Sequence, residues 1–261
     1  MLGLADVLAI LSGTLVGFTL GLVGGGGSIL AVPLLVYVVG VRSPHVAIGT
    51  SAVAVAASAA ANLLGHARAG NVKWSCAIVF AAFGMIGAAV GAALGKMVDG
   101  GRLLALFGGL MVAVGLLMLR PRQSAGDAAV RLTFASAPRL LPMLVGFGLG
   151  AGTLSGFFGI GGGFLIVPGL VGATAMPLIN AIGSSLVAVT AFGITTAVSY
   201  AISGLVDWWL AALFVIGGAA GGAAGIWLGA CLAHRKRALS LVFAAVVIAV
   251  GVYVVAAANL R

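Results

Sequence analysis

The chain has 261 residues, of which 62% are hydrophobic and 7% are charged, and its mean hydropathy is +1.29. These residues cannot supply the charged surface of a water-soluble domain, and the long continuous apolar runs exclude a membrane β-barrel, which shows short alternating segments. The net charge of +9 does not indicate nucleic acid, because the Lys and Arg residues lie in or beside breaks between apolar runs, where basic loops orient membrane helices. The composition predicts an all-α integral membrane protein in a lipid bilayer.

Ten apolar segments follow one another, five in each half of the chain. They cover residues 4–23, 28–40, 46–64, 74–95 and 103–119, and then 140–158, 163–176, 180–200, 208–231 and 239–258. The start of the chain lacks a basic n-region and an A-x-A cleavage site, so we interpret it as a retained first helix. Residues 4–40 as one helix would be about 55 Å long, too long for a hydrocarbon core of about 30 Å. The first two segments of each half therefore predict a broken helix or hairpin that turns within the membrane at its glycines.

The two halves are copies of one another. GLVGGGGSILAVP (21–33) matches GFFGIGGGFLIVP (156–168) at seven of 13 positions, and 47–74 matches 181–208. Further on, Gly84, Gly87, Gly91 and Gly95 match Gly218, Gly221, Gly225 and Gly229, with a spacing that puts them on one helix face as packing residues. We predict a first transmembrane repeat at 1–119, a cytoplasmic connector at 120–139 and a second transmembrane repeat at 140–261.

Loop charges favour inverted halves. If each half makes an odd number of crossings, nine of the thirteen Lys and Arg residues fall on one side and four on the other; parallel halves would give seven and six. The positive-inside rule prefers the first arrangement, which places both termini outside. Lys73 and Asp207 occupy matching positions, so the same loop is basic in one half and acidic in the other.

The glycine clusters predict a binding site for a small anion. The first amides of a helix have no partner within the helix and carry partial positive charge, and glycines let an anion approach them closely. In transporters with inverted repeats, broken helices present such ends near the bilayer midplane. The segments that start at Ser28 and Phe164 each follow a cluster, and no Lys or Arg lies inside an apolar segment. The candidate substrate-binding residues are Gly25, Gly26, Gly27, Ser28, Thr50, Ser51, Gly161, Gly162, Gly163, Ser184 and Ser185.

Each candidate has a structural alternative. Glycine clusters also permit close helix packing, and a hydroxyl near the start of a helix can cap it. For Asn62 and its counterpart Thr196 we expect a helix–helix hydrogen bond, and for His66 an interfacial position, with pH sensing as the alternative. The sequence shows no intramembrane carboxylate, Walker A motif, metal-ligand spacing or catalytic triad. It therefore predicts no enzyme, no metal and no cofactor, and we interpret Cys76 and Cys231 as packing residues.

The doubled motif resembles the paired signature of the TauE/SafE family of sulfite exporters. GLVGGGGSILAVPLL and GFFGIGGGFLIVPGL, followed by AIGTS and AIGSS, carry this resemblance, which spans nearly the whole chain. It implies a multi-pass protein of the bacterial inner membrane with about eight spanning helices, and transport, often outward, of sulfite or organosulfonates. The two motifs differ where Gly25 matches Ile160 and where Ser28 matches Gly163, so the two half-sites are unequal.

The sequence favours a secondary transporter that moves a small sulfur-containing anion by alternating access, driven by a proton gradient or by the anion gradient. A passive small-anion channel is the first alternative. The second is a membrane scaffold that transports nothing, in which the glycine clusters serve only packing.

Overall fold

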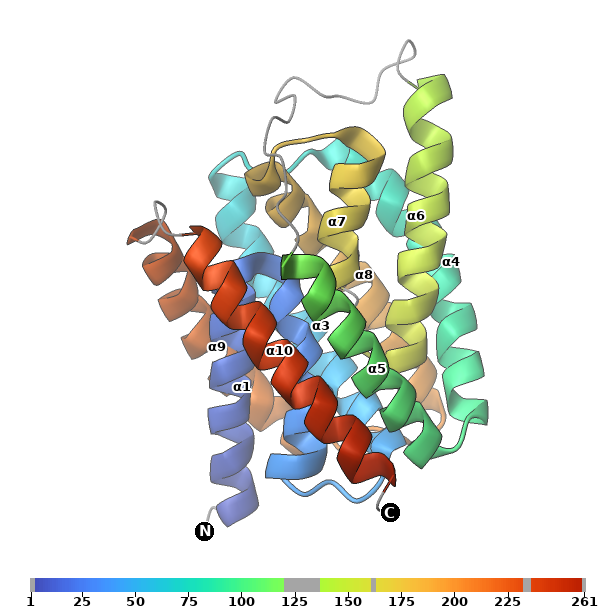
Figure 1. The fold of residues 1–261 in the computed structure, drawn as a ribbon, viewed down its shortest axis with the longest axis vertical. Coiled ribbons are helices and arrows are strands. Elements are labelled where there is room, and N and C mark those ends of the chain that lie inside the picture. Colours follow the sequence, from blue (N-terminus) through green and yellow to red (C-terminus); the bar gives the residue numbers. More distant parts are fainter. Residues whose placement is uncertain (1–2, 120–136, 161–162, 232–235, 260–261) are drawn as a thin grey trace.

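The structure is a computed structural model of the chain, described here for residues 3–119, 137–160, 163–231 and 236–259. Every regular element in these ranges is helical (Figure 1). The first half contains α1 (Leu4–Val23), the 3₁₀ segment η1 (Gly24–Leu30), the short α2 (Ala31–Pro33), the π-helical turn η2 (Leu34–Val38), α3 (Pro44–Arg68), α4 (Trp74–Met97) and α5 (Gly100–Leu119). The second half contains α6 (Ala137–Phe158), α7 (Gly163–Thr174), α8 (Leu178–Ile202), α9 (Trp208–Cys231) and α10 (Lys236–Asn259).

Eight of these helices are long and apolar enough to cross a membrane, which confirms the predicted class. Two shorter apolar helices, Gly27–Val38 and Leu165–Thr174, occupy the second position of each half, as a broken first pair requires. The second segment begins at Gly24 and not at Ser28, because the glycines themselves continue the chain as 3₁₀ turns. Helix α6 begins at Ala137, inside the predicted connector, whose residues 120–136 lie outside the described ranges.

The first helix of each half packs against the other half. Helix α1 packs along α9, and α6 packs along α4, so each half lays its first helix on the fourth helix of the other. The contacts of α3 with α9 and of α8 with α4 repeat the same relationship. Two further pairs, α3 with α8 and α5 with α10, join equivalent helices of the two halves. This pattern of matched contacts is what a two-fold relationship between the duplicated halves produces.

Glycines make these contacts close, as predicted for the glycine face of α4. A Cβ added at Gly91 would lie 2.8 Å from the backbone nitrogen of Phe157, and one at Gly87 would lie 2.9 Å from that of Thr153. The same relation holds in the other half, where a Cβ at Gly221 would lie 2.9 Å from the backbone nitrogen of Phe18. Because these distances leave no room for a methyl group, the α4–α6 and α1–α9 interfaces depend on glycine.

Equivalent helices of the two halves run in opposite directions where they meet. Gly49, near the start of α3, lies against Leu205, just after α8, and Gly183, near the start of α8, lies against Asn71, just after α3. Helices α3 and α8 are therefore antiparallel. In Figure 1, α1 begins at the lower end of the molecule and α6 begins at the upper end.

The loops after α3 and α8 have the same conformation. Gly70 and Gly204 both have a φ of 69°, a left-handed conformation that glycine adopts without steric cost. The N–H of Asn71 donates to the carbonyl of His66, and the N–H of Leu205 donates to the carbonyl of Tyr200, which ends both helices with a Schellman motif. The duplicated sequence therefore builds two copies of one loop, and each copy approaches the start of the other half's third helix.

Candidate functional site

The first glycine cluster forms a hairpin with the end of α1. A Cβ at Gly27 would lie 2.5 Å from the backbone carbonyl carbon of Thr19 and 2.6 Å from its Oγ1. Thr19 Oγ1 lies 2.9 Å from the carbonyl oxygen of Val16 and 3.4 Å from that of Gly27, within hydrogen-bonding range of both. Glycine at position 27 thus lets η1 fold back against the helix that precedes it.

The second glycine cluster turns at Gly159, against a helix of the first half. Gly159 has a φ of 66°, and the N–H of Ile160 donates to the carbonyl oxygen of Ser155 over 3.3 Å, so α6 also ends in a Schellman motif. A Cβ at Gly159 would lie 3.0 Å from the Cβ of Ile48, and Ser51 Oγ donates to the carbonyl oxygen of Gly159 over 3.1 Å. Helix α3 therefore holds the turn of the opposite half in place.

The structure brings the two glycine-rich segments together, because η1 packs against α7. Gly25, Gly26, Gly27 and Ser28 all lie in η1, where Ser28 is fully buried; Gly163 is the buried first residue of α7. Gly161 and Gly162 lie outside the described residues.

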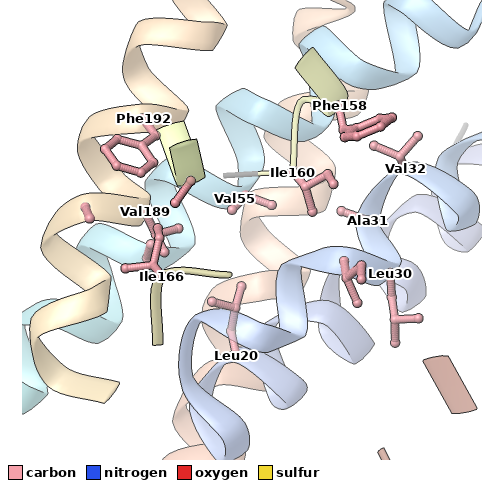
Figure 2. Close-up of a cluster of buried hydrophobic side chains, with 14 of the residues drawn as sticks. Leu20, Leu30, Ala31, Val32, Val55, Phe158, Ile160, Ile166, Val189 and Phe192 are labelled. Atoms are coloured by element: carbon pink, nitrogen blue, oxygen red, sulfur yellow. The ribbon is translucent and has the colours of Figure 1, made fainter. Parts of the chain in front are cut away.

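Apolar side chains pack around these segments beside the few hydroxyls already described. Leu30, Ala31 and Ile160 belong to one buried cluster, and Figure 2 shows Ile160 near Phe158 and Val55. An anion held between the two segments would therefore have to bind backbone amides or the hydroxyls of neighbouring helices.

The four predicted hydroxyls are fully buried, and three of them form hydrogen bonds with the opposite half. Thr50 Oγ1 accepts a hydrogen bond from the backbone N–H of Asp207 over 3.0 Å, and Ser184 Oγ accepts one from that of Lys73 over 2.8 Å. These bonds are equivalent, because Thr50 matches Ser184 and Lys73 matches Asp207 in the repeat.

The other two hydroxyls donate to backbone carbonyls. Ser185 Oγ donates to Ile182 over 2.7 Å, and Ser51 Oγ donates to Ile48 over 2.8 Å as well as to Gly159. The alternative of helix-start capping does not apply, because α3 and α8 begin six residues before Thr50 and Ser184, at Pro44 and Leu178.

Three buried hydroxyls depart from what the sequence predicts. Ser155 was not singled out, and Thr196 does not make the helix–helix hydrogen bond expected for it among the described residues. Ser155 Oγ, Thr196 Oγ1 and the Tyr200 hydroxyl are completely buried, and none has a hydrogen-bond partner among the described residues. Leaving such a group unpaired in an apolar interior costs about 1–3 kcal/mol. The departure from the repeat could have identified Ser155, since Leu20 occupies the matching position in the first half.

Asn62 differs from its prediction. Its Nδ2 atom is buried and makes no hydrogen bond within the described part of the chain. The amide lies against α9, where a Cβ at Gly222 would be 3.2 Å from Nδ2. The expected helix–helix hydrogen bond is therefore not made by this nitrogen, because glycine offers no side-chain acceptor at the contact. His66 is half-buried in the last turn of α3.

Lys96 lies inside α4, although the predicted apolar segment ends at residue 95. It belongs to the last turn of α4, and its Nζ donates to the carbonyl oxygen and Oγ of Ser199, both at 3.1 Å, and to Oγ of Ser203 at 3.0 Å. The same ammonium lies over the ring of Tyr200, 5.7 Å from its centroid. The three oxygen partners are neutral, so they solvate the positive charge without cancelling it.

Comparison with known proteins identifies the family. The family described as "Sulfite exporter TauE/SafE" matches residues 9–254, nearly the whole chain. The chain belongs to the TauE/SafE family. A "Probable membrane transporter protein" of Xylella fastidiosa is 54% identical to this TauE/SafE protein over 249 residues, covering 95% of this chain and 94% of the relative.

More distant relatives have the same kind of name. The "Probable membrane transporter protein YunE" of Bacillus subtilis is 29% identical, with 90% of this chain and 91% of the relative covered. A "Probable membrane transporter protein" of Haemophilus influenzae is 28% identical, covering 76% of this chain and 74% of the relative. No solved structure matches the chain. The TauE/SafE protein described here is therefore a membrane transporter, as predicted from its residues.

Proposed function

We propose that this TauE/SafE protein is a secondary transporter of a small sulfur-containing anion, such as sulfite or an organosulfonate, and that it works as an exporter in a bacterial inner membrane. The observation that carries the proposal is the contact between η1 and α7 inside a bundle of eight candidate spans. Broken segments at matching positions of two repeats are the usual binding elements of secondary transporters. The family name supports the substrate class.

The halves of such a transporter would be inverted, and alternating access would be a movement of one half against the other. Two features support this arrangement: the equivalent helices α3 and α8 are antiparallel, and the loops at 69–73 and 203–207 each contact the opposite half. An axis along the membrane normal would make equivalent helices parallel, whereas an axis in the membrane plane makes them antiparallel.

The anion would be bound without a charged side chain in the centre of the bundle. Backbone amides in the first turn of α7 and nearby hydroxyls are the candidate donors, since the amides of η1 take part in 3₁₀ hydrogen bonds. In a low-dielectric interior such donors interact strongly with an anion. An uncompensated buried cation would be costly in the absence of the anion, whereas neutral donors avoid that cost in the empty state.

Flux measurements test the proposal. Purified protein in proteoliposomes should move labelled sulfite or sulfoacetate faster than empty liposomes do, and the rate should saturate with substrate concentration. A pH gradient across the membrane will change the rate if protons drive transport. Flux no higher than in empty liposomes across a panel of sulfur anions would reject the substrate class. Single-channel currents in planar bilayers would favour the channel alternative.

A further inference from the structure

Three buried hydroxyls, those of Ser155, Thr196 and Tyr200, make no hydrogen bond with the described part of the chain. Other helical threonines, including Thr153, Thr190 and Thr195, donate to the carbonyl four residues earlier. Thr196 lies beside Thr195 on α8, but its hydroxyl has no partner in the part of the chain that the structure describes, although the same bond is open to any helical threonine. A hydroxyl that forgoes this bond in a dry interior is available for another acceptor.

The three hydroxyls belong to one region of the bundle. Helices α6 and α8 pack against each other and both pack against α4. Thr196 and Tyr200 are one turn apart on the same face of α8. The Tyr200 hydroxyl reaches α4, where it lies 3.2 Å from the position of a Cβ at Gly95, and the carbonyl oxygen of Phe157 lies 2.5 Å from that same position. The Tyr200 hydroxyl therefore lies beside the last turn of α6, which contains Ser155 and leads into the turn at Gly159.

The two halves differ at the positions of these three hydroxyls. In the repeat, the three residues match one apolar residue and two residues without a hydroxyl. Ser155 corresponds to Leu20, Thr196 to Asn62 and Tyr200 to His66. The charge is unequal as well, because Lys96 has Ala230 as its counterpart. Lys96 stacks on the ring of Tyr200 and so places a positive charge at the outer end of the hydroxyl group.

We propose that Ser155, Thr196 and Tyr200 donate hydrogen bonds to the oxygen atoms of the transported anion, and that Lys96 attracts the anion to this site from the side of the membrane where α4 ends. The inference rests on the proposed function, since it names the donors of that function's anion. A sulfite or sulfonate group fits the donor set because its three oxygens accept hydrogen bonds, and three O–H groups can satisfy it without a buried cation.

Cysteine labelling tests the site without requiring transport. Single-cysteine variants Ser155→Cys and Thr196→Cys would be made in a background with Cys76→Ala and Cys231→Ala. Each would be treated with the anion 2-sulfonatoethyl methanethiosulfonate, which carries a sulfonate, and with its trimethylammonium cation analogue. We expect the anion to react about tenfold faster than the cation, because positive potential concentrates anions at the site. We also expect sulfoacetate to slow that reaction.

Thr195→Cys on the same helix is the matched control, and it should show no preference for the anion and no protection by sulfoacetate. Equal rates with both reagents, or no reaction at either site position, would overturn the proposal. If the anion preference depends on Lys96, Lys96→Gln should reduce it; an unchanged preference would remove Lys96 from the site.

Isosteric variants of the natural protein give a second readout. Thr196→Val and Tyr200→Phe remove hydroxyls that have no partner among the described residues, so thermal stability in detergent should not fall. The stabilisation by added sulfoacetate should be lost. Thr195→Val and Tyr253→Phe, the latter on the exposed side of α10, should keep that stabilisation. A fall in stability of the site variants with the sulfoacetate effect retained would indicate a structural role and reject the site.

Failure of the site and failure of the proposed function are distinguishable. If wild-type protein moves no sulfur anion but the site cysteines still prefer the anionic reagent, the substrate class is wrong and the anion site stands. If wild-type protein moves sulfite normally while the site cysteines show no preference, the function stands and the site is wrong.

Discussion

The backbone N–H of Asp207 donates a hydrogen bond to Oγ1 of Thr50 over 3.0 Å, and this bond fastens the loop after α8 to the opposite half of the protein. Its counterpart runs from the N–H of Lys73 to Oγ of Ser184 over 2.8 Å. In each loop a backbone carbonyl also contacts a glycine of the opposite half. The carbonyl of Leu205 lies against Gly49, and that of Asn71 lies against Gly183. The turn that recurs in both repeats is thus attached, in each, to a glycine–hydroxyl pair of the other repeat.

Removing the Thr50 hydroxyl should weaken this attachment. Thr50→Val keeps the shape of the side chain but leaves the partly buried N–H of Asp207 without an acceptor, which should cost about 1–3 kcal/mol. Thr50→Ser keeps the acceptor and should restore most of the loss. Thermal denaturation in detergent measures both, with Thr190→Val as the control for a hydroxyl bonded only within its helix. A Thr50→Val protein as stable as wild type would show that the bond contributes nothing.

Two glycines of α6, Gly152 and Gly150, test the packing between α4 and α6 within one helix. A methyl group at Gly152 would lie 2.7 Å from the Cα and carbonyl carbon of Gly84, both backbone atoms that cannot rotate away. Gly152→Ala should therefore destabilise the protein by at least the roughly 1–3 kcal/mol typical of overpacking. Two residues away, Gly150 has no neighbour within 4 Å of an added Cβ.

Gly150→Ala should leave stability unchanged or raise it by up to about 1 kcal/mol, because alanine favours the helix. Each variant adds one methyl group to the same helix, so the difference between their melting temperatures reports on packing alone. Equal loss in both would mean that α6 requires glycine for flexibility and not for contact with α4.

The repeat made most of the fold predictable. Periodicity and length located the helices, and α1 and α9 begin and end at the predicted residues. The structure adds the packing of each first helix against the fourth helix of the other half. This packing joins residues far apart in the sequence, such as Gly17 on α1 and Gly218 on α9, which are more than a hundred positions apart. A pattern confined to one segment carries no information about its partner segment, so glycine faces were recognisable as packing surfaces but their partners were not.

The candidate site was predictable only in part. The matched hydroxyls at Thr50 and Ser184 were recognisable from the repeat, but their partners are backbone N–H groups of distant loops. Gly27 shows the same limit: an alanine there would meet the backbone of Thr19, so its substitution measures hairpin closure and cannot by itself report on binding. The Ser155 hydroxyl, which has no partner within the described ranges, could not be singled out from the sequence because a serine in an apolar helix ordinarily bonds to its own backbone.

The second glycine turn should be sensitive to substitution at Gly159. Alanine there must adopt a φ of 66° and also place its Cβ 3.0 Å from the Cβ and carbonyl oxygen of Ile48. Gly204 has nearly the same φ, 69°, but no atom within 4 Å of an added Cβ. Gly204→Ala should cost about 1–2 kcal/mol from backbone strain alone, and Gly159→Ala should cost more. Thermal unfolding of the two variants isolates the contact with α3, and equal losses would show that this contact can relax.

Accessibility of two matching loop positions tests the inverted arrangement directly. Ala69 and Ser203 occupy equivalent places just after α3 and α8, and both are exposed. In inverted halves, Ala69→Cys should react with a membrane-impermeant maleimide only from the cytoplasmic side, and Ser203→Cys only from outside, because basic residues such as Arg68 and Lys73 favour the cytoplasm. The measurement compares labelling in intact cells with labelling in inside-out vesicles, after Cys76 and Cys231 are replaced by alanine. Labelling of both cysteines from the same side would mean that the halves are parallel, and the alternating-access mechanism built on their inversion would fail with it.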